Sequence, residues 1–194
     1  VSPVNAVTPQ GQPELFIRNI PPVSTTDLVI TRPEIYFGEL TDHYIVVNTG
    51  EMEFDYPMGE DNAETMYEGE AGIRLNGLNR LLYALRERSA RLFLSGSINS
   101  DSRIIFDRNV MDRIQKIAPF LLYDEDPYLV IHEGRLFWMV DAFTIGNRYP
   151  YATPYLNNQY NSSIQGQYNY MRNSVKVLVD AYHGDTSFYI ADTA

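Results

Sequence analysis

The sequence predicts an α+β fold in which an antiparallel sheet with two hairpins packs against two amphipathic helices. Two C-terminal segments alternate apolar and polar residues, turn at a glycine and continue as a return strand, which is typical of hairpins. Two central segments place apolar residues at helical spacing. A chain of 194 residues with 44% hydrophobic and 21% charged content is long enough to bury a core of this kind.

The predicted domain organisation is simple. Residues 1–13 are rich in Pro, Gln, Thr and Gly and predict a flexible arm, and residues 14–194 predict a single domain. The chain opens with Val1-Ser2-Pro3 and no signal peptide, so we expect a fragment or a processed product whose missing segments hold a membrane part or a catalytic part. No apolar run is long enough for a membrane-spanning helix.

Charge and cysteine content exclude several classes of function. A net charge of −10 argues against a nucleic-acid groove and against binding to an anionic lipid surface. The chain has no cysteine, which excludes disulfides, cysteine zinc sites and thiol chemistry. It has no P-loop, G-x-G-x-x-G, H-E-x-x-H or G-x-S-x-G motif, so no cofactor and no metal are expected.

Two acidic segments carry alternative interpretations. Residues 51–70 hold eight Asp and Glu and no Lys or Arg, which suits either a cation site or a solvated acidic loop. The spacing matches no EF-hand loop, so the solvated loop is favoured. Asp124, Glu125 and Asp126 likewise suit Ca²⁺, but a turn before Pro127 is favoured. Before both, residues 44–49 predict a strand.

The first helix is predicted over residues 76–89. Its apolar stripe has the i, i+3, i+4, i+7 spacing of one helix face and consists of Leu78, Leu81, Leu82 and Leu85. Residues 91–95 then predict a strand. Asp107 is the expected N-cap of the second helix, which has Val110, Ile114 and Ile117 on its apolar face and ends near Pro119.

The hairpins occupy the C-terminal third. Residues 129–132 and 135–144 flank a two-residue loop at Glu133-Gly134, which places His132 opposite Arg135. Residues 175–182 and 186–191 flank a loop at 183–185. The two hairpins share a V-D-A-aromatic element, at 140–143 and 179–182. Its carboxylates, Asp141 and Asp180, are predicted to accept turn N–H groups rather than to form a catalytic pair.

A long polar stretch separates the hairpins. Residues 148–170 are rich in Tyr, Asn and Gln, and loops of this length are usually functional or disordered. Aromatic and amide side chains together bind sugars or peptides, although a partly ordered surface loop also accounts for the composition. With the two strand-end carboxylates, the candidate binding residues are Tyr149, Tyr151, Tyr155, Tyr160, Asp141 and Asp180.

Several segments in order resemble an uncharacterised bacterial family, number 0182, over roughly residues 14–192. They are R-P-E-I-Y-F-G-E at 32–39, V-N-T at 47–49, E-F-D-Y-P at 53–57, S-D-S-R-I at 100–104, Q-K-I-A-P-F-L at 115–121, V-D-A-F at 140–143, R-Y-P-Y at 148–151 and N-Y-M-R-N-S-V-K at 169–176, followed by the last hairpin. The hairpin loop at 183–186 departs from the expected aromatic-Asp-Gly-Thr by one extra residue.

The resemblance implies a membrane protein with N-terminal transmembrane helices and a large extracytoplasmic region, of which this chain is part. It implies no activity and no catalytic residues. We therefore expect a non-catalytic extracytoplasmic domain at the cell membrane that binds an envelope protein or polymer, with no nucleic acid and with membrane contact only through segments missing from this chain. The alternatives are a hydrolase of an envelope polymer that uses Asp141 and Asp180, and a structural module that supports the membrane region.

Overall fold

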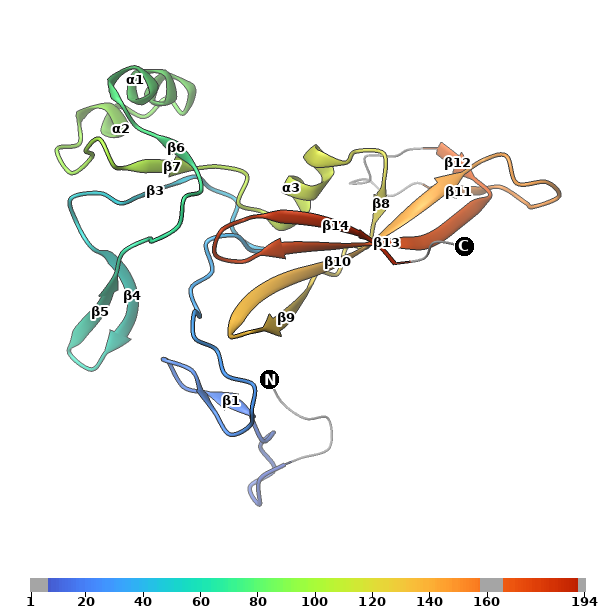
Figure 1. The fold of residues 1–194 in the computed structure, drawn as a ribbon, viewed down its shortest axis with the longest axis horizontal. Helices are drawn as coiled ribbons and strands as arrows, with labels where there is room; N and C mark the ends of the chain where they lie inside the picture. Colours follow the sequence, from blue (N-terminus) through green and yellow to red (C-terminus); the bar gives the residue numbers. More distant parts are fainter. Residues whose placement is uncertain (1–6, 158–165, 192–194) are drawn as a thin grey trace. The chain divides into compact units, whose positions relative to one another are not determined.

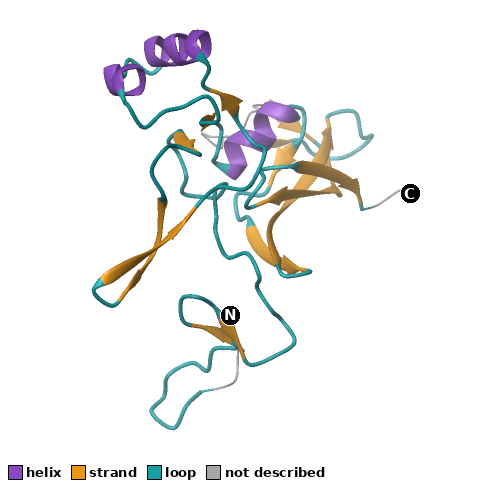
Figure 2. Ribbon diagram, turned by 60° about the vertical axis from the view of Figure 1, so that its left-hand side comes forward, coloured by secondary structure: helices purple, strands orange, loops and turns teal. Residues whose placement is uncertain are grey.

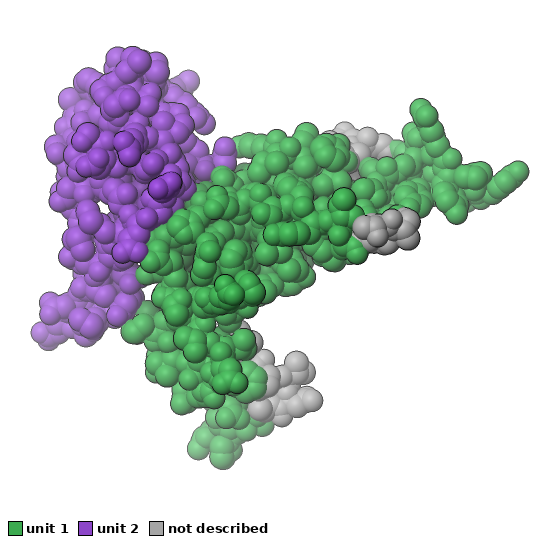
Figure 3. All heavy atoms as spheres, in the orientation of Figure 1, with its two compact units in different colours: residues 1–40, 109–194 green, residues 41–108 purple. Residues whose placement is uncertain are grey.

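The computed structural model describes residues 7–157 and 166–191 (Figure 1). The chain divides into two compact units, residues 1–40 with 109–194 and residues 41–108, coloured separately in Figure 3. The sequence predicts one domain over 14–194. The division arises because two separate apolar clusters form, one around Val140 and Val177 in the first unit and one around Leu75 and Ile104 in the second. The class is mixed α+β with mostly antiparallel sheets.

The first unit is built on a five-stranded antiparallel sheet. Its order is β14-β13-β10-β8, and β9 pairs with the start of β10. The strands are β8 (Leu122–Tyr123), β9 (Tyr128–His132), β10 (Arg135–Gly146), β13 (Tyr170–Asp180) and β14 (Thr186–Ile190). Two small hairpins complete the unit, β1 (Ile17–Arg18) with β2 (Val23–Ser24) and β11 (Tyr155–Asn157) with β12 (Gly166–Tyr168).

Tight turns set the register of the sheet. Glu133 and Gly134 join β9 to β10 with φ of 49° and 77°, and two positive φ angles in succession are what a type I′ turn requires. Arg135 consequently lies opposite His132. At the β13–β14 turn, Gly184 has φ of 73°, and a Cβ there would lie 2.5 Å from the Phe37 ring. A glycine is therefore needed for both conformation and space.

Helix α3 (Val110–Ile117) covers the sheet. Val110 and Ile114 are fully buried against Val140 and Val177. Asn109 is the N-cap, since its side chain accepts hydrogen bonds from the backbone of the first turn. The prediction that Asp107 caps this helix is wrong, because Asp107 has φ of 49° and lies before the cap.

An extended segment at residues 31–38 crosses the first unit. The backbone N–H groups of Tyr36 and Phe37 both donate to the carbonyl of Ala181, at 2.9 and 2.8 Å. The Trp138 indole donates to the Phe37 carbonyl at 2.9 Å. These bonds join the N-terminal segment to the last hairpin, although more than a hundred residues separate them in sequence.

The second unit contains helices α1 (Gly77–Arg86) and α2 (Ala90–Leu94), and a three-stranded sheet of order β3-β7-β6. The strands are β3 (Ile45–Val47), β6 (Ile73–Arg74) and β7 (Arg103–Ile105), and a hairpin is formed by β4 (Glu53–Met58) and β5 (Asp61–Thr65). Two predictions are wrong here. Residues 91–95 lie mostly in a helix capped by Ser89, and the acidic segment 51–70 is largely a hairpin instead of a loop.

Helix α1 packs by the face opposite to the predicted one. The N-cap of α1 is Asn76, which agrees with the prediction that the helix starts near this residue. Ala84 is buried, and Arg80, Tyr83 and Glu87 are half-buried. The four leucines of the predicted core stripe are exposed (Figure 2 shows α1 at one end of its unit). The prediction that both helices pack on one sheet is thus corrected, because α1 belongs to a different unit from α3.

Candidate binding site

An open pocket of about 550 Å³ lies in the first unit, beside the small β11–β12 hairpin. It is lined by side chains from β8, β10, β11, β12 and β13 and from the turn after β8, namely Leu122, Tyr123, Asp124, Glu125, Phe143, Tyr155, Tyr168 and Met171. Pockets that combine aromatic walls with a few polar groups are the usual form of a ligand site. This is therefore the candidate binding site.

Two tyrosines form one wall. Tyr155 on β11 and Tyr168 on β12 are directly opposite in the antiparallel register, and their ring centroids are 5.5 Å apart. Burial, together with the neighbouring Tyr155, raises the pKa of Tyr168 above its ordinary value. The Tyr168 hydroxyl therefore remains protonated at neutral pH and serves as a hydrogen-bond donor.

The opposite wall belongs to the main sheet. Asn173 and Ser174 on β13 together oppose Phe143 on β10, which is a bulge in the ladder. A bulge bends its strand and changes the direction of neighbouring side chains. Phe143, which lies opposite this bulge, is among the residues that line the pocket. Phe143 also pairs with Leu122 of β8, which brings a second apolar side chain to this wall.

Tyr123 fixes the base of the pocket to helix α3. Its hydroxyl lies 2.8 Å from the carbonyl of Ala118 and 3.1 Å from that of Ile114, at the end of the helix. Burial raises the pKa of Tyr123 to about 12. The ring is thus held in place by the helix end, and its apolar face is what it offers to the pocket.

Asp124 and Glu125 supply the charge. Both side chains are exposed, and both line the pocket immediately after β8. The Asp124 backbone N–H donates to the carbonyl of Asp141 at 2.9 Å, so its position follows from the sheet. Two carboxylates beside two tyrosines create an acceptor-rich edge that suits ligands bearing hydroxyl or ammonium groups.

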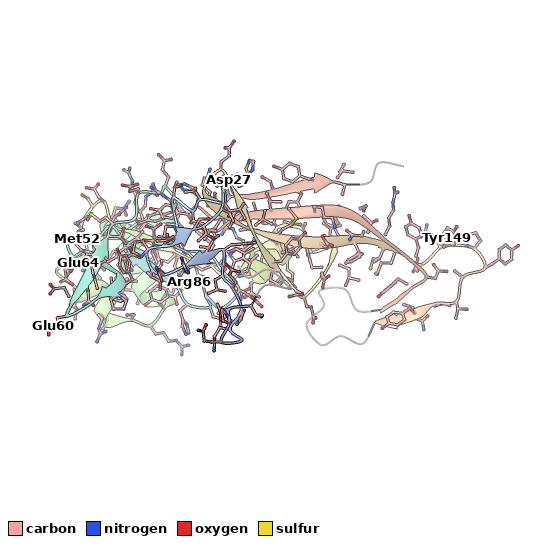
Figure 4. All side chains as sticks on the ribbon, turned by 90° about the horizontal axis from the view of Figure 1, so that it is seen from below. Asp27, Met52, Glu60, Glu64, Arg86 and Tyr149 are labelled. Carbon is pink, nitrogen blue, oxygen red and sulfur yellow. The ribbon has the colours of Figure 1, made fainter. Side chains whose placement is uncertain are left out.

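The four tyrosines that the sequence suggests as binding residues lie in different places. Tyr155 lines the pocket, whereas Tyr149 stacks on Tyr170 with ring centroids 5.6 Å apart. Figure 4 marks Tyr149 beyond the sheet, at the loop that follows β10. Tyr151 is fully exposed with φ of 62° and is not among the residues that line this pocket. Tyr160 lies outside the described residues.

Asp180 is buried at the last hairpin and holds its turn. Its Oδ1 accepts hydrogen bonds from the backbone N–H groups of Tyr182 and His183, each at 2.8 Å, and its Oδ2 pairs with Arg135. The side chain is only 3% exposed. This is the turn-capping role that the sequence predicts for a strand-end carboxylate. Asp180 is not among the residues that line the pocket.

Asp141 lies on the same strand as Phe143 but outside the pocket. It pairs with Lys176 directly across the ladder and accepts a hydrogen bond from the Asn173 amide at 3.0 Å. The Lys176 hydrogen bond is the main reason why the pKa of Asp141 falls below its ordinary value. Asp141 therefore acts as an ionised cross-strand partner within β10, and the prediction that it accepts turn N–H groups is wrong.

The register separates the two predicted carboxylates. Asp180 pairs with Phe137, four residues along β10 from Asp141, which corresponds to about 13 Å at 3.3 Å per residue. Glycosidase carboxylate pairs lie about 5 to 9.5 Å apart. Each carboxylate also has its own basic partner, so this pair does not form a hydrolytic centre.

Sequence reasoning missed most of the pocket. Tyr168, Phe143 and Met171 line it but were not candidate residues, and Asp124 and Glu125 were interpreted as a turn in preference to a Ca²⁺ site. The one sequence feature that could have indicated the pocket is that Asp124 and Glu125 lie shortly before the strand predicted at residues 129–132. The bulge and the β11–β12 pairing, which bring the remaining residues together, have no clear sequence signature.

Neither a metal site nor a membrane-spanning helix is present in residues 7–157 and 166–191. No three His, Asp or Glu side chains come together there as a metal site would require. Within the same ranges, no helix is both long and apolar enough to cross a membrane.

Comparison with known proteins gives a family but no activity. The family model described as "Uncharacterised protein family (UPF0182)" matches residues 1–194. A UPF0182 protein of Alkaliphilus metalliredigens is 58% identical over 192 residues, which is 99% of this chain and 20% of the relative. UPF0182 proteins of Clostridium acetobutylicum and Pelotomaculum thermopropionicum are 50% and 48% identical, over 99% and 100% of the chain and 20% of each relative.

The chain thus spans one fifth of the length of these bacterial relatives, as a domain of a larger protein does. No solved structure matches it. The full-length family match and the high identities place the chain in the Uncharacterised protein family UPF0182.

Proposed function

We propose that this chain is a non-catalytic extracytoplasmic domain of a bacterial membrane protein that binds an envelope polymer in the pocket beside β11 and β12. The observation that carries the proposal is the juxtaposition of Tyr155 and Tyr168 with the exposed carboxylates of Asp124 and Glu125. The described residues that line the pocket include no Ser, Cys, Lys or His, so none of them pairs such a nucleophile with an activating base, which favours binding over catalysis.

The chemistry of the pocket favours a glycan segment. Sugar rings present C–H faces that pack on aromatic rings, and their hydroxyl groups donate hydrogen bonds to carboxylates. Because the pocket of about 550 Å³ is open, a polymer can bind there by one segment while the rest of the polymer extends into solvent on both sides. The net charge of −10 favours a neutral or amine-bearing polymer over an anionic one.

A thermal-shift titration with soluble peptidoglycan-type oligosaccharides tests this function. At a ligand concentration 100-fold above Kd, we expect the Tm to rise by at least about 5 °C, since binding stabilises only the folded state. The Tyr155→Ala/Tyr168→Ala variant should lose this shift. The Tyr151→Ala variant is the matched control and should keep it, because Tyr151 is exposed and outside the pocket.

An unchanged Tm across neutral, amine-bearing and acidic oligosaccharides would contradict a glycan site. A shift that survives in the Tyr155→Ala/Tyr168→Ala variant would show that the glycan binds elsewhere. Either result would overturn the assignment of the pocket.

A further inference from the structure

Helix α1 exposes a continuous apolar face. Its leucines Leu78, Leu81, Leu82 and Leu85 are 68, 42, 54 and 67% exposed. Helix α2 follows directly and exposes Phe93 at 47% and Leu94 at 75%. Exposed apolar residues are ordinary when scattered, but a grouped set on adjacent helices marks an interaction surface.

The helix pair presents this face on a rigid support. The guanidinium of Arg80 on α1 donates to three backbone carbonyls at and after the end of α2, those of Leu92, Ser95 and Ile98. Leu92 is buried in the core of the unit. Because α1 already uses its Arg80 and Ala84 face for the core, rotating the helix to hide the leucines would break this packing.

Charge is segregated within the second unit. Residues 71–100 contain five arginines and one acid, Glu87, which pairs with Arg86. Residues 51–70 contain eight acids and no Lys or Arg. Figures 1 and 2 both show the β4–β5 hairpin and the helix pair extending to opposite ends of the unit.

We propose that the α1–α2 pair is a docking surface for an anionic lipid bilayer. The leucines, with Phe93 and Leu94, enter the boundary between headgroups and acyl chains, and the exposed Arg88 and Arg91 bind lipid phosphates. An apolar helix face flanked by basic residues is the pattern of helices that lie in a membrane interface. The proposal concerns a site separate from the pocket and does not depend on the glycan assignment.

The net charge of −10 disfavours an anionic surface for the chain as a whole, but residues 71–100 are locally basic, with five arginines and one acid. Charges separated by more than about 8 Å are screened at physiological ionic strength. The six residues of β4 extend for about 20 Å, so the acids near the tip of the hairpin, such as Glu60, lie well beyond that distance from its base. Figure 4 labels Glu60 at this tip. Glu51 lies nearer the helices, since it accepts a hydrogen bond from Ser97 just after α2, so the acids that are screened from the bilayer are those toward the tip.

Charge also favours lipid over a second copy of the chain. A symmetric contact between two α1 faces would bring together Arg88 and Arg91 of both copies, and Glu87, the one acid of this segment, is already paired with Arg86. An anionic bilayer supplies that counterpart. This proposal differs from the expectation that membrane contact occurs only through missing segments.

Vesicle co-sedimentation of the 194-residue chain tests the proposal. We expect binding to vesicles of phosphatidylcholine and phosphatidylglycerol at 7:3, no binding to pure phosphatidylcholine, and weaker binding as salt rises. The Leu78→Gln/Leu82→Gln variant should lose at least tenfold in partitioning. The Arg88→Gln/Arg91→Gln variant should lose about twentyfold, because each basic residue near an anionic surface contributes a severalfold factor.

Matched variants make the outcome decisive. Ile117→Gln replaces an exposed apolar residue of α3 and should leave vesicle binding unchanged. Tyr155→Ala/Tyr168→Ala should also leave it unchanged. Wild-type chain that does not sediment with anionic vesicles would overturn the proposal, as would binding that the leucine substitutions leave intact. Concentration-dependent dimerisation abolished by Leu78→Gln/Leu82→Gln would assign the face to a second copy instead.

Discussion

Helices α1 and α3 both carry apolar residues at helical spacing, but most of these residues lie in opposite environments. Val110 and Ile114 of α3 are fully buried beneath the five-stranded sheet, whereas Leu78 and Leu85 of α1 are about two-thirds exposed. Helical periodicity identifies an apolar face without saying what covers it. The comparison teaches that the α3 stripe stabilises its unit, while the α1 stripe is available for another surface.

The largest expected difference between the two helices is in their apolar side chains. Ile114→Ala should lower the free energy of unfolding by about 3 kcal/mol, because it leaves a cavity in a packed core. Denaturant unfolding followed by Trp138 fluorescence measures this, since Trp138 is the one tryptophan of the chain and packs on the same cluster.

Leu82→Ala is the corresponding change in α1 and should alter the stability of its unit by no more than about 0.5 kcal/mol. Far-UV circular dichroism during denaturation follows this unit. A cost near that of Ile114→Ala would show that the leucine face is packed and would remove the contrast between the helices.

The packing face of α1 gives the next largest effect. Arg80→Ala should destabilise the second unit by about 2 kcal/mol, because three half-buried carbonyls lose a charged donor. Hydrogen exchange of the α1 and α2 amides reports this locally. Arg88→Ala is the control and should leave exchange nearly unchanged, and equal effects of the two variants would contradict the assigned packing face.

Replacing the N-cap should lower the free energy of unfolding by a similar amount in α1 and α3, whereas replacing residues of the two apolar faces should not. Asn76 and Asn109 both accept a first-turn N–H, so Asn→Ala at either should cost about 1 kcal/mol. Asn109 also donates to the Glu39 carbonyl at 2.7 Å, which adds a small increment at that site. Denaturant midpoints of the two variants check this, and a difference of several kcal/mol would show that local capping does not act equally in the two helices.

The C-terminal end of α3 has a pH-sensitive partner. Tyr123→Phe should cost about 1 kcal/mol at neutral pH through lost hydrogen bonds to the helix carbonyls. Burial raises the pKa of Tyr123 to about 12, against 10 when unfolded. Its contribution is thus fully present below pH 10 and is lost as pH rises from 10 to 12, because the unfolded chain loses its proton first.

Stability of wild type and Tyr123→Phe measured from pH 9 to 12 isolates this contribution. The wild-type free energy of unfolding should fall more steeply between pH 10 and 12 than that of the variant. Parallel curves would show that Tyr123 is not shielded from solvent at the helix end.

The features that the sequence predicts correctly depend on interactions between residues that are close together in the sequence. The Glu133-Gly134 turn, the α1 start at Asn76 and the turn-capping Asp180 each depend on neighbours within a few residues. The α2 segment fails because a five-residue apolar run has no resolvable period, although Ser89 before it is a cap residue. Asp107 and Asn109 are both good caps two residues apart, and only backbone conformation distinguishes them.

Non-local features could not be predicted in this way. The pocket needs the Tyr155–Tyr168 pairing and the bulge opposite Phe143, which depend on strand register across the sheet. The division into two units depends on which apolar face finds a partner. Composition drew attention to the tyrosine-rich stretch, and only Tyr155 among its four candidate tyrosines lines the pocket in the described residues.

The central claim, that α1 is a docking face while α3 is a structural one, is tested most directly by site-specific fluorescence. The chain has no native cysteine, so Leu82→Cys and Glu60→Cys each give a single labelling site for an environment-sensitive fluorophore. With anionic vesicles, emission from position 82 should shift to the blue and intensify, and emission from position 60, at the tip of the acidic hairpin, should not change. No shift at position 82, or equal shifts at both positions, would contradict the account.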